Sequence, residues 1–255
     1  MNATPHKTAL VTSGASPIGR QIALALAERG WDVVVHYGQS EPDALAVVQE
    51  IFALGRRAAA LECDLANESA VKGLLARANN ALGATVAPIS CIVNNASLCE
   101  ADSAANFSQA MLDAHMHPNL VAPVLLARAL HAATPAGQQA VVVNLLDRHM
   151  HNPDPDYLSH ALSKAALHSA TPLLAKALAP TVRVVGVAPG LTLPSDEQAN
   201  KPGSQIPAGN ASTPQDVAAA VCFVADSRTI TGTIIVVDAG QHLTPIRRNA
   251  MPLAT

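Results

Sequence analysis

Short apolar runs and amphipathic stretches alternate along the whole chain. The runs are rich in valine and isoleucine, as at Val33–Val35, which is typical of parallel strands buried on both faces. The alternation predicts a doubly wound, Rossmann-type α/β fold with a seven-stranded parallel sheet and helices on both faces. The strands are expected at Thr8–Val11, Asp32–His36, Arg57–Leu61, Ile89–Val93, Ala140–Leu145, Val182–Val187 and Thr233–Val237.

Capping and helix-breaking residues set the helix boundaries. Asn67 and Thr213 are the expected N-caps of two helices. Pro118 and Pro123 interrupt a long helical region, and Pro172 interrupts another. The helices are expected at Ile18–Glu28, Pro42–Leu54, Asn67–Leu82, Asn106–His131, Asp156–Leu178 and Pro214–Ala225.

No linker, repeat or low-complexity segment divides the 255 residues, so residues 1–255 are expected to form a single domain. Residues 193–212, rich in Pro, Gly, Asn and Ser, are interpreted as a substrate lid, because ligands in this architecture bind at the carboxyl ends of the strands. A mobile surface loop is the alternative. Residues 244–255 are expected to be a C-terminal tail.

Composition narrows the range of partners. The net charge is −3, and only 14% of residues are charged and 2% aromatic, which argues against a nucleic-acid partner. No apolar stretch reaches the roughly 18 residues of a membrane span, and the first residues lack a signal peptide, so a cytoplasmic protein is expected. The histidine pairs His115/His117 and His149/His151 have no further ligand cluster beside them, so no metal site is expected.

A turn of small residues, Thr12–Gly19, joins the first strand to the first helix. Its backbone N–H groups and the helix N-terminus would favour a pyrophosphate, although such turns are common. Further motifs follow later strands or lie in a helix. They are Asn94–Ser97 after the fourth strand, Lys164 in the fifth helix, Pro189–Thr192 after the sixth strand and Asp238–Gly240 after the seventh.

In order and spacing, these motifs resemble the short-chain dehydrogenase/reductase family over nearly the whole chain, from about Lys7 to Leu243. Within that family, His36–Ser40, Ser97 and Asp147 are similar to pteridine reductases. The resemblance implies an oxidoreductase that passes a hydride to a small carbonyl or imine substrate, for which a pterin or dihydropterin is suggested. It also implies a homo-oligomer, a tetramer in most of the family.

The resemblance further implies a set of cofactor contacts. They are Ser13, Ser16, Ile18 and Gly19 at the pyrophosphate, His36, Tyr37, Gln39 and Ser40 after the second strand, Asp64 and Leu65 at the adenine, Asn95, Ala96 and Ser97 at the adenosine ribose and the middle of the cofactor, Pro189, Gly190, Leu191 and Thr192 at the nicotinamide, and Lys164 at its ribose.

The residues after the second strand indicate which dinucleotide is preferred. NAD-specific relatives place an acidic residue there, whereas this chain has Tyr37 followed by Gly38, Gln39 and Ser40. No carboxylate in that stretch would repel a 2′-phosphate, and Gln39 and Ser40 can donate to it. We therefore expect NADP(H), and less readily NAD(H). In the turn, Ser13 and Pro17 replace two glycines of the family, and Pro17 has no N–H for a phosphate.

The resemblance implies Asn119, Asp147, His160 and Lys164 as catalytic residues, with Asp147 where most members have a serine. His160 stands in place of the catalytic tyrosine, one helical turn before Lys164. The lysine should favour a neutral imidazole, which is a poor acid. Turnover is therefore expected to be low, and His160→Tyr to raise it. Tyr157 lies about two turns before Lys164 and is interpreted as a pocket wall.

Two functions are compatible with these residues. One is an oxidoreductase in which His160 or Asp147 supplies the proton while Lys164 and Asn119 organise the relay. The other is a nucleotide-binding pseudoenzyme that works as a sensor or scaffold. A measurement of turnover separates them.

Overall fold

The computed structural model describes residues 7–83, 86–147, 153–190, 192 and 206–243. The expected lid is therefore described only from residue 206 onward. Leu191, His149, His151 and the expected tail lie outside the described residues.

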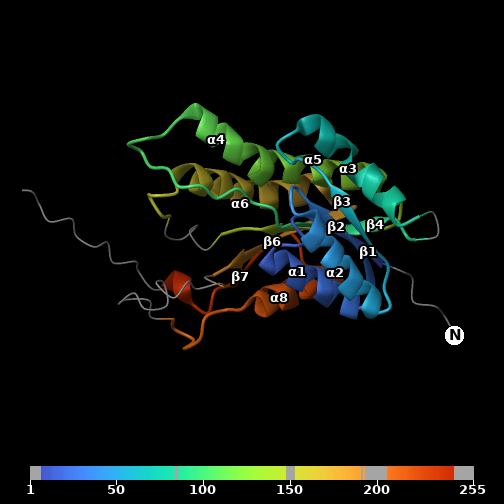
Figure 1. Cartoon of the computed structure of the whole chain (residues 1–255). Helices are drawn as coiled ribbons and strands as arrows, with labels where there is room; N and C mark the ends of the chain where they lie inside the picture. Colours follow the sequence, from blue (N-terminus) through green and yellow to red (C-terminus); the bar gives the residue numbers. More distant parts are fainter. Residues whose placement is uncertain (1–6, 84–85, 148–152, 191, 193–205, 244–255) are drawn as a thin grey trace, which may run out of the picture.

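Seven parallel strands form one sheet in the order β3-β2-β1-β4-β5-β6-β7, which confirms the predicted fold (Figure 1). Most strand ends differ from the predicted ones by one or two residues. The strands are β1 (Lys7–Val11), β2 (Trp31–Tyr37), β3 (Ala58–Glu62), β4 (Ile89–Asn94), β5 (Ala140–Leu145), β6 (Val182–Pro189) and β7 (Ile234–Val237).

The helices form two layers, one on each face of the sheet (Figure 1). One layer contains α1 (Pro17–Glu28), α2 (Glu41–Ala53) and α8 (Pro214–Asp226). The other contains α3 (Glu68–Ala81), α4 (Gln109–Met116), α5 (Ala122–Ala133) and α6 (Leu158–Leu178). The predicted caps are confirmed, since the side chains of Asn67 and Thr213 accept from the third N–H of α3 and α8. None of these described helices has the length and apolar character of a membrane span.

The interruption predicted at Pro118 within the helical region Asn106–His131 is confirmed, but the predicted start of that region is wrong, and so is the interruption predicted at Pro172, because α6 continues through it. Ser108 caps α4, which begins three residues later than predicted, and a π-helical turn, His117–Val121, separates α4 from α5. In that turn the N–H of Ala122 donates to the carbonyl of His117, five residues back. Neither Pro118 nor Pro123 has an N–H, so the regular ladder is interrupted on both sides of Asn119. The turn therefore sets how this buried residue faces its surroundings.

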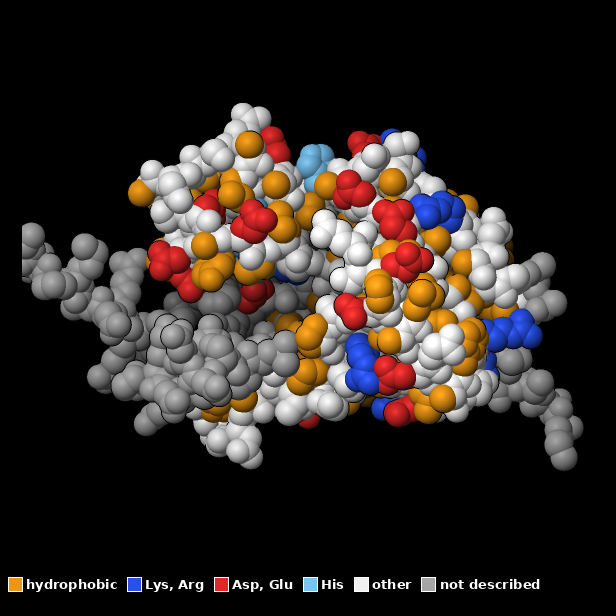
Figure 2. Space-filling model, viewed as in Figure 1, with side chains coloured by type: hydrophobic (Ala, Val, Ile, Leu, Met, Phe, Trp, Pro, Cys, Tyr) orange, Lys and Arg blue, Asp and Glu red, His pale blue; other side chains and the backbone are white. Residues whose placement is uncertain are grey.

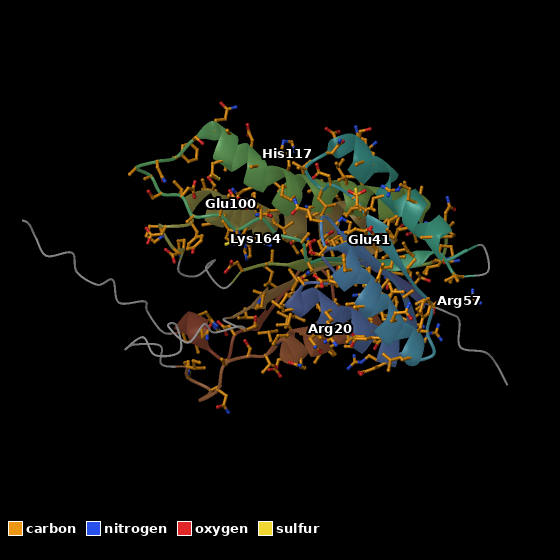
Figure 3. The ribbon with its side chains drawn as sticks, in the orientation of Figure 1. Arg20, Glu41, Arg57, Glu100, His117 and Lys164 are labelled. Carbon is orange, nitrogen blue, oxygen red and sulfur yellow. The ribbon has the colours of Figure 1, made fainter. Side chains whose placement is uncertain are left out.

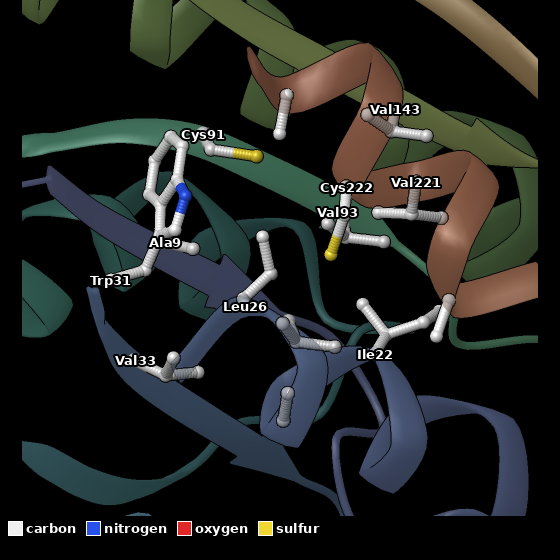
Figure 4. Packing of buried hydrophobic residues seen from close by; sticks show 14 of the residues in the cluster. Ala9, Ile22, Leu26, Trp31, Val33, Cys91, Val93, Val143, Val221 and Cys222 are labelled. Atoms are coloured by element: carbon white, nitrogen blue, oxygen red, sulfur yellow. The ribbon is translucent and has the colours of Figure 1, made fainter. Parts of the chain in front are cut away.

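Alternate residues of each strand pack under different helix layers. Val33 and Val35 join the cluster beneath α1, α2 and α8, shown in part in Figure 4, whereas Val34 joins the cluster beneath α3 and α5. The strand residues are almost completely buried on both sides. Such packing fixes the carboxyl ends of the strands, where the loops that carry polar side chains begin.

Candidate active site

The carboxyl ends of β5 and β6, the loop after β4 and the start of α1 line a cavity of about 220 Å³. Figure 2 shows the face hollowed below the side chains that cover α4 and α6, and Figure 3 shows Lys164 between α6 and the sheet. The cavity contains residues from distant parts of the sequence. They are Ile18, Asn95, Ser97, Leu145, Leu146, Asp147, His160, Lys164, Pro189 and Gly190.

The turn before α1 is tightly built. Ser13 has the left-handed backbone (φ 46°) that favours glycine, which explains a glycine in the family there. Ser16 caps α1 by accepting from the N–H of Gly19 at 3.2 Å. A Cβ on Gly19 would lie 2.2 Å from the carbonyl oxygen of Ser13, so a side chain would collide with the backbone. The amide of Asn95 braces the turn through the oxygens of Thr12, Ser13 and Ser16.

The turn leaves donors for a phosphate. The N–H groups of Ala15 and Ile18 have no hydrogen-bond partner among the described residues. Both lie at the N-terminus of α1, where free N–H groups and the helix dipole favour an anion. Pro17 occupies the first helical turn, where the missing N–H leaves no bond within the helix unmade. The turn therefore fits a dinucleotide pyrophosphate with two backbone donors.

His36 is buried and holds the turn from the side of β2. Its Nδ1 accepts from the N–H of Ser13 at 3.1 Å, and its Nε2 donates to the carbonyl of Cys63 at 2.9 Å. Burial lowers the pKa of His36, consistent with a neutral ring in that pair of contacts. The imidazole is thus used within the protein, and the N–H of Ser13 is not free for a phosphate.

The end of β2 is more acidic than the sequence indicated. Tyr37 is the last residue of the strand, and Gln39 and Ser40 are exposed. Burial and a hydrogen bond with Glu41 raise the pKa of Tyr37, with Glu62 adding to the effect. The expected cofactor preference rested only on Tyr37 to Ser40, whereas the carboxylate of Glu41, the next residue and the first of α2, also interacts with Tyr37.

The remaining predicted cofactor residues lie along the same edge of the sheet. The Asp64 carboxylate accepts from the N–H of Ala66 at 2.9 Å, and Leu65 packs in the core beneath α3. The N–H of Ala96 donates to the hydroxyl of Thr12 at 2.9 Å. A Cβ on Gly190 would approach Asp238 to 2.7 Å, so only glycine fits there. Ser97, Pro189 and Gly190 line the cavity, and Thr192 is half-buried beside that strand end.

His160 is held between two acceptors. Its Nε2 lies 2.8 Å from Oδ2 of Asp147, and its Nδ1 lies 2.9 Å from the carbonyl oxygen of Leu98. A backbone carbonyl can only accept, so Nδ1 carries a hydrogen, and the short contact with Asp147 requires a second hydrogen between Nε2 and the carboxyl group. Burial lowers its pKa, but hydrogen bonds to Asp147, Cys99 and Leu98 outweigh that effect and raise the pKa to about 9. The expectation of a neutral imidazole is wrong, because Asp147 compensates the charge.

Lys164 lies one helical turn beyond His160 and is buried. Its Nζ donates to the carbonyl of Leu145 at 2.9 Å. Burial lowers its pKa to about 8, although Asp147 and Cys99 act in the opposite direction. An ammonium has three donors, so two remain for groups in the cavity.

Asn119 is fully engaged by its neighbours. Its Oδ1 accepts from the N–H of Leu98 at 2.8 Å, and its Nδ2 donates to the carbonyl of Leu98 and to the hydroxyl of Ser163, both at 2.9 Å. The side chain thus fixes the backbone oxygen that His160 contacts. Asn119, Asp147, His160 and Lys164 are brought together as expected, but Asn119 acts at the back of the cluster.

Several residues that support this cluster could not be recognised from the sequence. Asp102 receives both the N–H and the hydroxyl of Ser159 and so caps the start of α6. Leu98 contributes a backbone carbonyl, for which no side-chain signal exists. Tyr157 pairs through its backbone with Asp102 and is not among the residues that line the cavity, contrary to its interpretation as a pocket wall.

A phosphate-binding turn, a switch in strand order and a proton-bearing cluster share one edge of the sheet, and together they define a dinucleotide-dependent oxidoreductase. A family model described as enoyl-(acyl carrier protein) reductase matches residues 14–242. The chain belongs to the short-chain dehydrogenase/reductase family.

The chain is similar to relatives over nearly its whole length. It is 31% identical to (2S)-[(R)-hydroxy(phenyl)methyl]succinyl-CoA dehydrogenase subunit BbsD of Thauera aromatica, covering 93% of this chain and 97% of that protein. It is 29% identical to the 3-oxoacyl-acyl-carrier-protein reductase FabG of Staphylococcus aureus over 93% and 98%. Among solved structures, it is 35% identical to FolM alternative dihydrofolate reductase 1 from Brucella canis, complexed with NADP, with a TM-score of 0.87 over 96% and 97%.

Proposed function

We propose that this protein is an NADP(H)-dependent reductase of a small carbonyl or imine substrate, with His160 as its source of protons. The observation that carries the proposal is the ring of His160, hydrogen-bonded to both Asp147 and Leu98 in a cavity that Lys164 also lines. When bound, the dinucleotide supplies the hydride, and the protein must supply a proton to the substrate oxygen or nitrogen.

The transferable proton lies between Nε2 of His160 and Oδ2 of Asp147. Both residues line the cavity, so a substrate atom can take the proton from the imidazolium directly or through the carboxyl group. An imidazolium with a pKa of about 9 is protonated at neutral pH and is an acid of suitable strength there. This argues for retained chemistry and against the pseudoenzyme.

Lys164 and the turn before α1 position the dinucleotide in this proposal. The two remaining donors of Lys164 would bind the nicotinamide ribose hydroxyls, and the N–H groups of Ala15 and Ile18 would bind the pyrophosphate. The NADP in the Brucella canis relative supports NADP(H) as the cofactor. Glu41 weakens that preference, because a carboxylate beside Tyr37 would repel a 2′-phosphate.

The name of that relative, an alternative dihydrofolate reductase, supports a dihydropterin as the first substrate to test. The residues that line the cavity offer no aromatic ring on which a pterin could stack, however. All six Phe, Tyr and Trp residues lie in the described part of the chain, and none lines the cavity. A flat substrate would therefore rest on aliphatic side chains such as Leu146, so substrates with smaller or non-aromatic imines belong in the same panel.

The experiment follows NADPH and NADH oxidation with dihydrobiopterin, dihydrofolate, a cyclic imine and a small ketone. Binding of each cofactor is measured separately by calorimetry. We expect substrate-dependent NADPH oxidation that falls by roughly 100-fold or more in His160→Phe, with NADPH binding retained. Lys164→Ala should weaken NADPH binding. Tight NADPH binding without turnover on any substrate would support the pseudoenzyme and overturn the proposal.

We also propose, from the family, that the protein is a homo-oligomer. The exposed Leu162 and Leu173 on α6 support an interface on that helix. Light scattering of the wild type and of a Leu162→Glu variant would test it, because the variant should dissociate.

A further inference from the structure

His115 is a completely buried residue of α4 that the proposed reaction does not use. Its Nδ1 lies 2.8 Å from the carbonyl of Met111, one turn back in the same helix. Its Nε2 accepts from the backbone N–H of Glu100 at 3.1 Å. Nδ1 must therefore carry the hydrogen and Nε2 the lone pair, so His115 is fixed in one tautomer with both nitrogens in use.

The backbone of residues 98–100 connects His115 to His160. Asn119 holds this segment at Leu98 through both the N–H and the carbonyl, and His115 holds it at Glu100. The carbonyl of Leu98 in turn accepts from Nδ1 of His160. The two histidine rings lie edge to face, with centroids 6.3 Å apart. His115 of α4 and Asn119 of the π-helical turn thus fix the segment that carries the carbonyl oxygen of Leu98. Because this oxygen can only accept, Nδ1 of His160 must carry a hydrogen.

We infer that His115 is a positioning residue that keeps His160 in its doubly protonated form by holding the backbone of residues 98–100 against it. Without the acceptor on His115, the N–H of Glu100 loses its partner, and the segment keeps its anchor only at Leu98, where Asn119 holds it. The carbonyl of Leu98 then shifts relative to Nδ1 of His160, that hydrogen bond weakens, and the neutral ring gains population. This inference deepens the role of His160 in the proposed function.

Other titratable groups also surround His160 and must be considered in a test. Asp147 faces it from the loop after β5, and Cys99 from the segment after β4. Lys164 follows one turn later on α6, and the carboxylate of Asp102 binds the adjacent Ser159. A substitution at position 115 leaves Asp147 and Lys164 unchanged. Cys99 belongs to the segment that His115 holds, and His115 helps to lower the pKa of Asp102, so the comparison with His115→Gln is needed.

The test compares His115→Phe, which keeps the ring volume without an acceptor, with His115→Gln, whose side-chain oxygen can still accept from Glu100. His117→Phe, at an exposed position two residues away, is the matched control. NMR of the labelled histidine rings reports the titration and tautomer of His160 in the full chain, without any substrate. The descending alkaline limb of kcat/KM is measured in parallel, and melting temperatures report the purely structural cost.

In His115→Phe we expect the titration of His160 to move to lower pH by about one unit, a roughly tenfold change in its proton affinity. His115→Gln should restore most of the wild-type titration, and His117→Phe should not change it. A folded His115→Phe whose His160 titrates as in the wild type overturns the inference. If that variant does not fold, the tautomer of His115 in the wild type serves as the test. NMR that places its hydrogen on Nε2 would also overturn the inference. If the protein had no reductase activity, the proposed function would be contradicted, but the NMR result would still decide whether His115 controls the protonation of His160.

Discussion

Asn119 and His160 donate hydrogen bonds to the same atom, the carbonyl oxygen of Leu98, each at 2.9 Å. The oxygen has two lone pairs, so these donors satisfy it completely. Asn119 therefore acts on His160 through a shared acceptor without touching it. Substitutions at either residue should show non-additive effects on activity, because they alter one hydrogen-bonded unit.

The first prediction concerns the pH dependence of reduction. His160 must be protonated to act as an acid, so kcat/KM should fall as pH rises through about 9. Lys164, with a pKa of about 8, titrates in the same range, so the observed value belongs to the cluster. Asp147→Asn removes a group that raises the pKa of His160, and the descending limb should move to lower pH. A wild-type profile without that limb would contradict the role given to His160.

The second prediction reverses the expectation for His160→Tyr. The improvement expected from a tyrosine depended on a neutral imidazole. The structure instead places the ring nitrogen 2.8 Å from Asp147, and a longer phenol would bring its oxygen closer to that carboxylate. Such a neighbour raises the pKa of a phenol. We expect His160→Tyr to reduce substrate more slowly than the wild type in steady-state kinetics, and His160→Tyr combined with Asp147→Ser to recover part of the loss.

The free energy of unfolding should depend on pH through the pair formed by His160 and Asp147. The pKa of His160 is raised by folding, from 6.5 to about 9. Its contribution to stability is therefore fully present below about pH 6.5 and is lost as pH rises through about 9. The difference in unfolding free energy between the wild type and His160→Phe should be larger at about pH 6 than at about pH 10.

Urea unfolding at both pH values measures that difference. Lys164 acts in the opposite direction, because burial depresses its pKa to about 8. It is present in both proteins, so its effect largely cancels. A difference that stayed constant with pH would mean that the histidine is not charged in the folded protein.

Cofactor choice should respond to Glu41. Glu41→Gln removes a negative charge beside Tyr37, where an adenosine 2′-phosphate would lie, and should tighten NADPH binding by about three- to tenfold at low salt. NADH binding should change less. Asp43→Asn, in the same first turn of α2 but without an effect on Tyr37, is the control. Equal gains for both cofactors, measured by calorimetry, would exclude this explanation.

Two glycines should respond in opposite ways to alanine. Gly19→Ala would place a methyl group 2.2 Å from the carbonyl oxygen of Ser13, so the turn must open, at a cost of about 1–3 kcal/mol. Loss of NADPH binding should accompany it. Gly73→Ala, inside α3 with open space around it, should stabilise the protein by about 0.5–1 kcal/mol. Thermal unfolding of both variants tests the pair, and a neutral Gly19→Ala would show that the turn is more adaptable than its packing indicates.

The sequence predicted the layers of the fold because valine-rich strands such as β5 and capped helices such as α8 carry strong local signals. It also placed Asn95, Asp147 and Lys164 at one edge, since parallel strands end on the same side. The charge of His160 was beyond such reasoning. It depends on a backbone oxygen of Leu98, which Asn119 holds from a π-helical turn, and on the carboxyl group of Asp147 in another loop.

The pairing of β1 with β4 also affects synthesis of the chain. Leu10 lies opposite Ile92, so one edge of β1 stays unpaired until β4 has left the ribosome. During that interval β1 to β3 expose an apolar edge, including Val11, that could pair with another chain. The sheet closes at its centre only when β4 arrives, and contacts so distant in sequence form slowly. Nascent chains that stall before residue 94 should therefore depend most strongly on chaperones.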